Sequence, residues 1–375
     1  METVDEPLPI IRPTLPDLEA VFAAVRDSYN SGTVTVGKLV DLFEREIGAF
    51  CGVGHAVAVS SCTSGLMLAL AALEAPKGAE VIVPSFTFAA TVQAVLWNEL
   101  TPVFVDCLPG TLTVDPGEVE KALSPRTVAI TPVTIYGLPP DLDRLTETSR
   151  DKGIPLVCDS AQGLGSTYRG VSAGRFGWCE VFSLSPTKVI TAIEGGVVTT
   201  NDSALAAKLR SMRDYGKGPD GEEMLFNGLS ARMSEFHAAV GLLSLRNAAA
   251  LIEARLNLIR TYRERAAALH GCRVQDFPAD RTSSGNYFTL LIGPAAAMDR
   301  DGVFQALKTK NIQSKRYFYP PVHSHTAFRS RPHRLVGDLA QTWSSSSQAL
   351  ALPLYSHMTQ ADQDRVCRTL ESLLK

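Results

Sequence analysis

The segment VFSLSPTKVITAIEGGVVTT, residues 181–200, places one lysine, Lys188, between two apolar runs that are each typical of a buried strand. A lysine is seldom buried without a partner, because removing an ammonium group from water is costly unless the group loses its proton. The ordinary interpretation is a loop lysine that pairs with a carboxylate or extends toward solvent. The chemical alternative is an amine that forms an imine with a carbonyl compound.

Residues that follow other apolar runs add two further kinds of chemistry. Thr63 and Ser64 stand in a turn before a helix-length segment, where backbone N–H groups and hydroxyls could bind a phosphate. Asp159 follows another run, and Gln162 lies three residues later. Ligands of open parallel sheets bind beyond the carboxyl ends of the strands, so we expect these side chains to meet Lys188. A phosphate site, a carboxylate for a protonated ring nitrogen and an imine-forming lysine are the groups that pyridoxal phosphate needs.

Short runs rich in valine and isoleucine predict the strands that position these side chains. The seven runs cover residues 55–61, 79–85, 101–106, 126–133, 154–161, 179–185 and 194–200. Segments of helical length lie between most of them, which predicts an α/β fold with a mostly parallel seven-stranded sheet covered by helices. No crossover helix fits between the last two runs, which flank Lys188, so we expect that pair to be antiparallel.

The second part of the chain has a different pattern. Residues 234–271 form a long amphipathic stretch without proline, which predicts one connecting helix that begins after Ser234. Beyond it, residues 286–293 and 312–320 resemble strands, and residues 298–310 and 359–375 resemble helices. We therefore expect an N-terminal arm and large cofactor-binding domain over residues 1–245, and a smaller C-terminal α+β domain over residues 246–375.

Composition excludes several classes of protein. The net charge is −3, with 36 basic against 39 acidic residues, so there is no basic field for nucleic acid or for a membrane surface. The first ten residues are acidic and lack the pattern of a signal peptide, and no apolar run is long enough to span a membrane. Seven scattered cysteines have neither metal-site nor redox spacing, so we expect reduced thiols and a cytoplasmic protein.

Several motifs, in order, resemble the DegT/DnrJ/StrS family of sugar aminotransferases, which have the aspartate aminotransferase fold. These motifs are Thr63-Ser64-Gly65, PSFTFAAT, DSAQGLGSTYRG, SLSPTKVITAIEGG and RMSEFHAAVGL. The resemblance extends from about residue 31 to about residue 323. It implies an enzyme that uses pyridoxal 5'-phosphate and pyridoxamine 5'-phosphate to move an amino group from L-glutamate to a keto sugar.

The resemblance also implies roles for individual residues. Lys188 would form the Schiff base and carry protons, and Asp159 would pair with the pyridinium nitrogen. Thr63, Ser64 and Ser183 would bind the cofactor phosphate, and Gln162 would lie near the ring. Phe88 would stack on the ring, although ordinary core packing explains a phenylalanine there equally well.

One segment departs from the family pattern. Relatives have Asn-x-Arg before Met-Ser-Glu, contributed to the cofactor phosphate by the neighbouring subunit, whereas this chain has Ser230, Ala231 and Arg232. The resemblance thus implies a homodimer with composite active sites, in which the shorter serine needs a shifted loop, a bridging water or more reliance on Arg232.

Substrate recognition is the least determined feature. The resemblance offers five side chains near residue 319 for a nucleotide diphosphate, although they could equally form a solvated basic edge: Lys315, Arg316, Tyr317, Tyr319 and His323. His323 and His325 have the spacing of a metal pair but lack a third ligand, so we predict no metal site.

The expected substrate is a nucleotide-linked 3- or 4-keto-6-deoxysugar. A keto-cyclitol is the rival substrate, because relatives of both kinds share the catalytic motifs. The rival from another class is a cofactor-binding regulator without turnover. A sugar dehydratase variant of the family has histidine in place of the lysine, so Lys188 argues against that activity.

Overall fold

The central sheet is assembled from seven strands whose apolar residues are buried on both faces. The structure is a computed structural model that describes residues 6–375, so the first half of the acidic segment over residues 1–10 lies outside the described residues. All seven predicted runs form strands. They are β1 (His55–Val59), β2 (Glu80–Pro84), β3 (Thr101–Val105), β4 (Thr127–Ile130), β5 (Val157–Asp159), β8 (Cys179–Ser183) and β9 (Gly196–Thr200).

Strand order confirms a mostly parallel sheet but not the predicted count of seven strands. One half of the sheet has the order β1-β9-β8-β5, and the other has the order β4-β2-β3 with the short β13 (Arg334–Leu335) at its edge. Parallel bridges Ile130↔Leu156 and Val133↔Asp159 join the two halves. Strand β9 pairs antiparallel with both β8 and β1, as expected for two strands separated only by the loop that carries Lys188.

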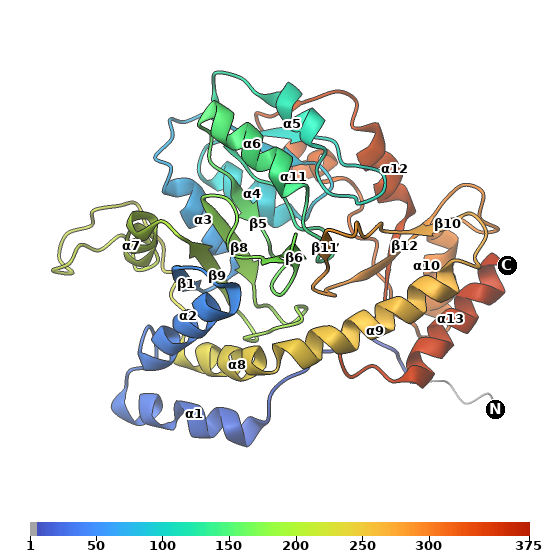
Figure 1. Cartoon of the computed structure of the whole chain (residues 1–375), viewed down its shortest axis with the longest axis horizontal. Coiled ribbons are helices and arrows are strands. Elements are labelled where there is room, and N and C mark those ends of the chain that lie inside the picture. The colour runs from blue at the N-terminus through green and yellow to red at the C-terminus, as the bar shows by residue number, and fades with distance from the viewer. Residues whose placement is uncertain (1–5) are drawn as a thin grey trace.

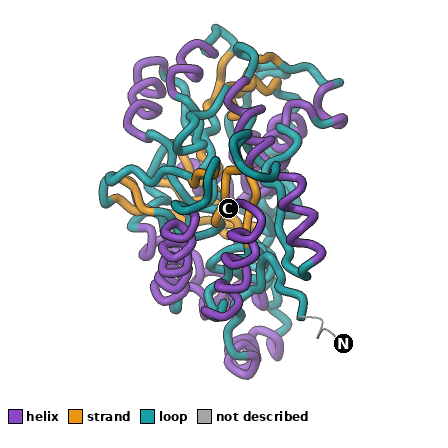
Figure 2. The backbone as a smooth tube through the Cα atoms, turned by 90° about the vertical axis from the view of Figure 1, so that its right-hand side faces the viewer, coloured by secondary structure: helices purple, strands orange, loops and turns teal. Residues whose placement is uncertain are grey.

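Helices cover both faces of this sheet. In β1, Val57 and Val59 pack toward α3 (Cys62–Ala71), α4 (Ala89–Trp97) and α7 (Ser203–Met212). Ala56 and Ala58 alternate with them and face α2 (Lys38–Cys51) and α8 (Glu235–Arg246). Helices α5 (Pro116–Ala122) and α6 (Leu142–Lys152) lie over the other half of the sheet (Figure 1). In the view of Figure 2, strands lie among helices on either side.

The predicted long helix is two helices. Helix α8 ends at Arg246 and α9 (Ala248–Ala266) begins after Asn247, whose φ of −100° and ψ of 6° interrupt the helical backbone. The prediction of one continuous helix over residues 234–271 was therefore wrong at this residue. The amphipathic pattern continues across the break because both helices bury one face, so it does not reveal an interruption of one residue.

A second core lies in the C-terminal part. Strands β10 (Cys272–Val274), β12 (Phe288–Ile292) and β14 (Ala349–Leu352) form an antiparallel sheet. It packs with α9, α10 (Arg300–Thr309) and α13 (Gln360–Leu374). Residues 312–320, predicted as a strand, make only isolated bridges at Ile312 and Lys315. The boundary predicted at residue 245 stays a prediction.

The remaining elements are short or peripheral. Helix α1 (Leu18–Ser31) packs on α8, and Leu8 near the N-terminus bridges to Ile312 in the C-terminal part. The other elements are β6 (Thr167–Tyr168), β7 (Val171–Ser172), β11 (Arg281–Thr282), η1 (Val322–Ser324), α11 (Thr326–Arg329) and α12 (Ala340–Gln348). No helix in residues 6–375 combines the length and the apolar character that crossing a membrane requires.

Candidate active site

A pocket of about 340 Å³ opens at the carboxyl ends of the sheet strands. The first turn of α3, the end of β5, the loop between β8 and β9, and two segments of the C-terminal part enclose it. Its walls include six of the predicted site residues, together with the predicted substrate residue Tyr317. These six are Thr63, Phe88, Asp159, Gln162, Ser183 and Lys188.

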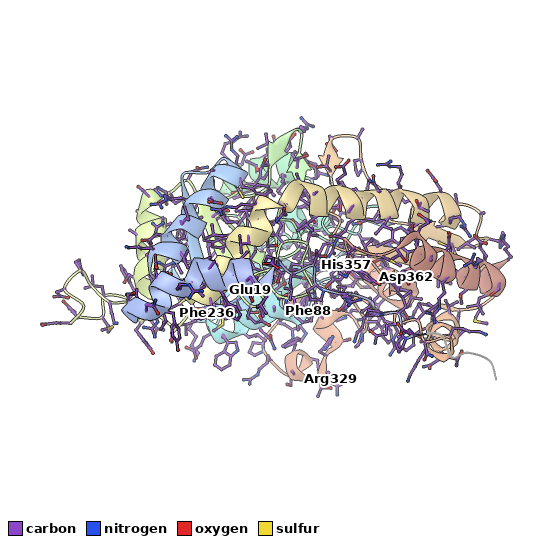
Figure 3. All side chains as sticks on the ribbon, turned by 90° about the horizontal axis from the view of Figure 1, so that it is seen from below. Glu19, Phe88, Phe236, Arg329, His357 and Asp362 are labelled. Carbon is purple, nitrogen blue, oxygen red and sulfur yellow. The ribbon has the colours of Figure 1, made fainter. Side chains whose placement is uncertain are left out.

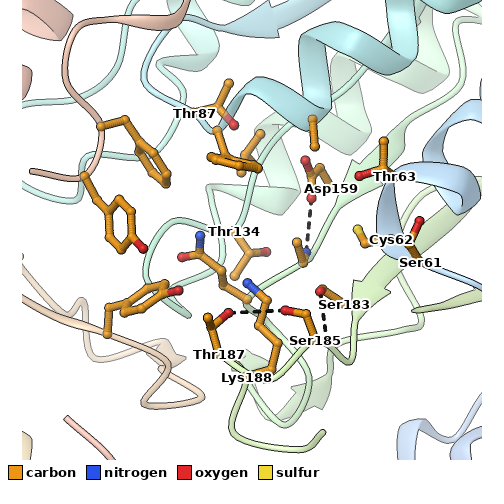
Figure 4. A pocket seen from close by; sticks show the side chains of 18 of the residues that line it. Ser61, Cys62, Thr63, Thr87, Thr134, Asp159, Ser183, Ser185, Thr187 and Lys188 are labelled. Carbon is orange, nitrogen blue, oxygen red and sulfur yellow. Dashed lines mark hydrogen bonds between the residues drawn. The ribbon is translucent and has the colours of Figure 1, made fainter. Parts of the chain in front are cut away.

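Lys188 lies in the loop between β8 and β9, and its side chain points into the pocket (Figure 4). Its backbone N–H donates to the carbonyl of Ser185, which tightens the loop below the side chain. Within residues 6–375, no carboxylate forms an ion pair with its ammonium group. Nζ instead lies 5.8 Å from the centre of the Tyr287 ring. The interpretation of Lys188 as a salt-bridged loop lysine is therefore wrong, and its amine is available to a ligand.

Asp159 ends β5 and is 4% exposed. One carboxylate oxygen accepts from the hydroxyl of Thr91 at 2.6 Å, and the other accepts from the N–H of Ala161 at 3.1 Å. Burial raises the pKa of Asp159, and these two hydrogen bonds and the charge of Lys188 oppose that rise. A cation placed in the pocket would stabilise this carboxylate further, which suits a protonated ring nitrogen.

The first turn of α3 lies at one end of the pocket. Ser61 and Ser64 make a reciprocal capping box, in which the Ser61 hydroxyl accepts from the Ser64 N–H and the Ser64 hydroxyl accepts from the Ser61 N–H. Within the described chain, the N–H groups of Cys62 and Thr63 have no hydrogen-bond partner and face the pocket end of the helix. Of the three residues predicted to bind the phosphate, Thr63 and Ser183 line the pocket. The hydroxyl of the third, Ser64, is instead bonded within the helix cap.

Phe88 and Gln162 occupy different environments. The Phe88 side chain is 58% exposed at the pocket wall, which contradicts ordinary core packing and leaves the ring free to stack. Its ring centre lies 6.4 Å from that of Phe318. Gln162 is buried, and its side-chain amide oxygen, Oε1, accepts from the backbone N–H of Tyr136 at 2.7 Å. That bond fixes the amide orientation at the pocket wall.

Ser230 and Arg232 do not line this pocket. Arg232 forms a 2.5 Å ion pair with Asp214, and its guanidinium lies 5.3 Å from the centre of the Tyr215 ring. The Ser230 hydroxyl accepts from the same guanidinium at 3.4 Å. Both residues are held in place on the loop after α7, outside their own chain's pocket.

Four of the predicted substrate residues also have partners elsewhere. Arg316 pairs with Asp301 at 3.1 Å and lies over the ring of Tyr319. Lys315 pairs through its backbone with Ala351. The ring of His323 contacts the hydroxyl of Ser85 at 2.5 Å. Only Tyr317 of this group reaches the pocket wall, and a role in nucleotide binding stays a prediction for all five.

Three residues at or beside the pocket were not among the predicted site residues. Thr91 lies on α4, outside the pocket wall, and its hydroxyl donates to Asp159, whereas Glu194 and Tyr287 line the wall from separate segments. Tyr287 belongs to an apolar run that is typical of a buried strand. Across residues 6–375, no cluster of three or more histidine, cysteine, aspartate or glutamate side chains is arranged to hold a metal ion.

Comparison with known proteins decides the family. The model of the DegT/DnrJ/EryC1/StrS aminotransferase family matches residues 17–371. The chain belongs to this family. GDP-perosamine synthase of Caulobacter vibrioides is 35% identical over 347 residues, which cover 91% of each chain. The resemblance that the motifs indicated is therefore confirmed, and so is the prediction of an aminotransferase.

Similar solved structures confirm the fold. DesI, solved in the presence of its TDP-sugar product, has a TM-score of 0.91 and 35% identity, with 98% of this chain and 93% of DesI covered. The putative sugar aminotransferase Spr1654 of Streptococcus pneumoniae, solved in a PLP form, has a TM-score of 0.89 and 25% identity, with 98% and 100% covered. The same protein was also solved in a PMP form.

Proposed function

We propose that this aminotransferase moves the amino group of L-glutamate to a nucleotide-linked 3- or 4-keto-6-deoxysugar, with pyridoxal phosphate bound in the pocket of Lys188 and Asp159. The meeting of these two side chains in one pocket carries the proposal. The names of GDP-perosamine synthase and of DesI with its TDP-sugar product support a nucleotide-linked sugar as the acceptor. The proposal includes a cytoplasmic location, which the odd number of scattered cysteines favours.

The residues present fit the cofactor. The free N–H groups at the start of α3 and the Ser183 hydroxyl suit its phosphate, and Asp159 suits its ring nitrogen. When bound, the cofactor supplies an electron-withdrawing ring that stabilises negative charge on the donor carbon. Asp159 would hold the ring nitrogen protonated, and the free amine of Lys188 would accept a proton and return it. Phe88 would cover the ring.

The charge of the pocket supports a site completed by a second copy of the chain. Lys188 is the only basic side chain among the described residues that line the pocket, which also contains the carboxylates of Asp159 and Glu194. A cofactor phosphate, the carboxylates of glutamate and a nucleotide diphosphate all bring negative charge. We infer that Arg232 of a second copy supplies part of the missing positive charge.

The surface also suits a homodimer. Helix α1 exposes Leu18, Phe22 and Tyr29, and Phe236 of α8 lies beside Tyr29 with ring centres 6.4 Å apart. Figure 3 shows Phe236 on this face, where α1, marked by Glu19, lies across α8. Tyr215, Met224 and Leu225 are exposed on the loop after α7, which projects from the body in Figure 1. Apolar side chains gathered on a projecting loop and a neighbouring helix face are typical of an interface between copies.

A keto-cyclitol acceptor and a regulator without turnover are the competing functions. A regulator would bind the cofactor but leave it unchanged by glutamate in a single-turnover experiment. A cyclitol aminotransferase would pass that test and then transfer the amino group to cyclitols rather than to nucleotide sugars. A screen of keto sugars on different nucleotides and of keto-cyclitols, with detection of the amine product, separates the two substrates.

The first prediction tests Lys188 directly. Borohydride reduction of the enzyme loaded with pyridoxal phosphate should attach the label to the peptide that contains Lys188. Lys188→Ala should remain folded, bind pyridoxamine phosphate without a covalent bond and lose turnover. A label on any other lysine, or turnover in the alanine variant, contradicts the proposed site.

A further inference from the structure

We propose that Tyr287 is a positioning residue that holds the free ammonium group of Lys188 inside the pocket. The inference rests on the proposed role of Lys188 and adds a second residue to it. Lysine has a flexible four-carbon stem, so an amine that must take up a proton and return it at one place needs a contact that keeps it there. The ring of Tyr287, 5.8 Å from Nζ, lies within the range of a cation–π contact.

The surroundings of Lys188 make this contact significant. Tyr287 is 6% exposed, so water competes little for the face of its ring. Within residues 6–375, no carboxylate forms an ion pair with Lys188, and the carboxylates that line the same pocket are those of Asp159 and Glu194. A carboxylate in place of the ring would bind the ammonium strongly and hinder release of its proton. An aromatic ring attracts the cation more weakly, so it can hold the amine and still allow the proton to leave.

Tyr287 is itself held by three separate parts of the chain. Its ring centre lies 5.2 Å from that of Tyr317, and its N–H donates to the carbonyl of Tyr136 at 3.4 Å. The carbonyl of Asn286, directly before it, accepts from Nη1 of Arg255 at 3.2 Å. Arg255 is 1% exposed and has no carboxylate partner among the described residues. The ring therefore has a fixed position relative to Lys188, unlike an aromatic side chain that only fills space.

The experiment compares Tyr287→Leu, which removes the ring, with Tyr287→Phe, which keeps the ring and loses only the phenol. In cofactor-free enzyme, the reaction of Lys188 with trinitrobenzenesulfonate is followed by peptide mapping. The ring holds the amine against the pocket wall and limits its access to the reagent, so labelling should be several-fold faster in Tyr287→Leu. Tyr287→Phe should restore slow labelling. Tyr355→Leu, at a buried tyrosine outside the pocket, is the control and should label like the wild type.

The second measurement uses loaded enzyme and glutamate alone. Tyr287→Leu should lower the single-turnover rate by about three- to thirtyfold, the size expected of a cation–π contact. It should also increase the isotope effect with α-deuterated glutamate, because the proton transfer becomes slower relative to the other steps, and change the apparent affinity for glutamate little. Tyr287→Phe should recover most of the rate.

The outcomes separate this inference from the proposed function. A borohydride label away from Lys188 would overturn both. A label on Lys188 together with wild-type labelling rate and isotope effect in Tyr287→Leu would overturn only the role of Tyr287. If Tyr287→Leu lowered only the affinity for glutamate, the ring would line the pocket without positioning Lys188, and the inference would be wrong. If Tyr287→Leu does not fold, Tyr287→Met offers the same comparison with a more adaptable side chain.

Discussion

At the residue scale, the buried carboxylate of Asp159 destabilises the cofactor-free protein, although the proposed function with bound cofactor requires it. Its carboxylate is buried at the end of β5 with two hydrogen-bond donors, yet burial still raises its pKa. A carboxyl group whose pKa is higher in the folded than in the unfolded state stabilises the fold only while it is protonated. Its contribution is complete below the unfolded pKa near 4 and is lost as pH rises through the folded value.

The second prediction follows from this sign. Cofactor-free Asp159→Asn should melt at a higher temperature than the wild type at pH 7 to 8, because the amide carries no charge to bury. The difference should shrink as pH falls toward 4. The amide oxygen can accept from Ala161, and its NH2 can donate to Thr91, whose hydroxyl can turn toward Thr87. The same variant should keep the cofactor but lose about 100- to 1000-fold in rate.

Calorimetry of the cofactor-free proteins across pH, with single-turnover rates of the loaded proteins, checks both statements. A lower melting temperature for Asp159→Asn at pH 7 would contradict the cost assigned to the buried charge. A rate near that of the wild type, at equal cofactor occupancy, would contradict the pairing with the ring nitrogen.

A site residue could be predicted from the sequence when it stands next to a strand pattern. Lys188, Asp159 and Thr63 directly follow strand patterns, so the rule that ligands bind at strand ends located them. Thr91 lies in the PSFTFAAT motif and Tyr287 in an apolar run, but neither segment indicates that folding brings Thr91 to Asp159 or Tyr287 to Lys188. Asp159 is evident from sequence, whereas the hydroxyl that bonds to it is not.

At the scale of elements, Glu235 connects three helices through one carboxylate. It lies in the first turn of α8, is fully buried, and accepts from the N–H groups of Gly37, Leu39 and Val40 at 3.0 Å each. The hydroxyl of Ser28 in α1 donates to it at 2.8 Å. Helix α2 has no cap from its own residue Gly37, so Glu235 supplies that cap from a distant part of the sequence.

The third prediction concerns this contact. Glu235→Ala should lower the free energy of unfolding by about 3 kcal/mol or more, because several buried donors lose their acceptor together. Glu46→Ala, which removes an exposed pair with Arg246, should cost less than about 1 kcal/mol. Urea unfolding of both variants measures the difference. Equal losses would show that the α2 cap is not set by Glu235.

Elements were predicted well where one pattern covers a whole segment. The seven strands are short apolar runs between turn residues, and each was found at its predicted place. The break at Asn247 was missed because amphipathic character continues through it. Residues 312–320 resemble a strand in composition, but they end in Pro320, which Pro321 follows, and they form only isolated bridges.

For the whole molecule, the proposed composite site would add Arg232 of a second copy to a pocket in which, among the described residues, Lys188 is the one basic side chain. The fourth prediction mixes two inactive proteins, Lys188→Ala and Arg232→Glu, under conditions of proven subunit exchange. If sites are shared between subunits, half of the re-paired dimers contain one intact site of two. Activity should therefore recover to about a quarter of the wild-type level. No recovery would place each site within a single chain.

The control for this mixture uses two residues of one pocket. Lys188→Ala mixed with Asp159→Asn should not recover, because both residues line the pocket of the same chain and no pairing restores it. Ser230→Asn alone should bind the cofactor as well as the wild type or more tightly, since the longer amide extends a donor from the same loop.

The placement of β9 has a consequence for the order in which the protein is built. Strand β1 lies at the edge of its sheet and pairs only with β9, whose residues follow about 140 positions later in the chain. At a synthesis rate of about 5–20 residues per second, β1 and the turn after it must wait many seconds on the ribosome for that partner. The start of α3, at one end of the pocket, is therefore among the first segments made and among the last to reach its final position.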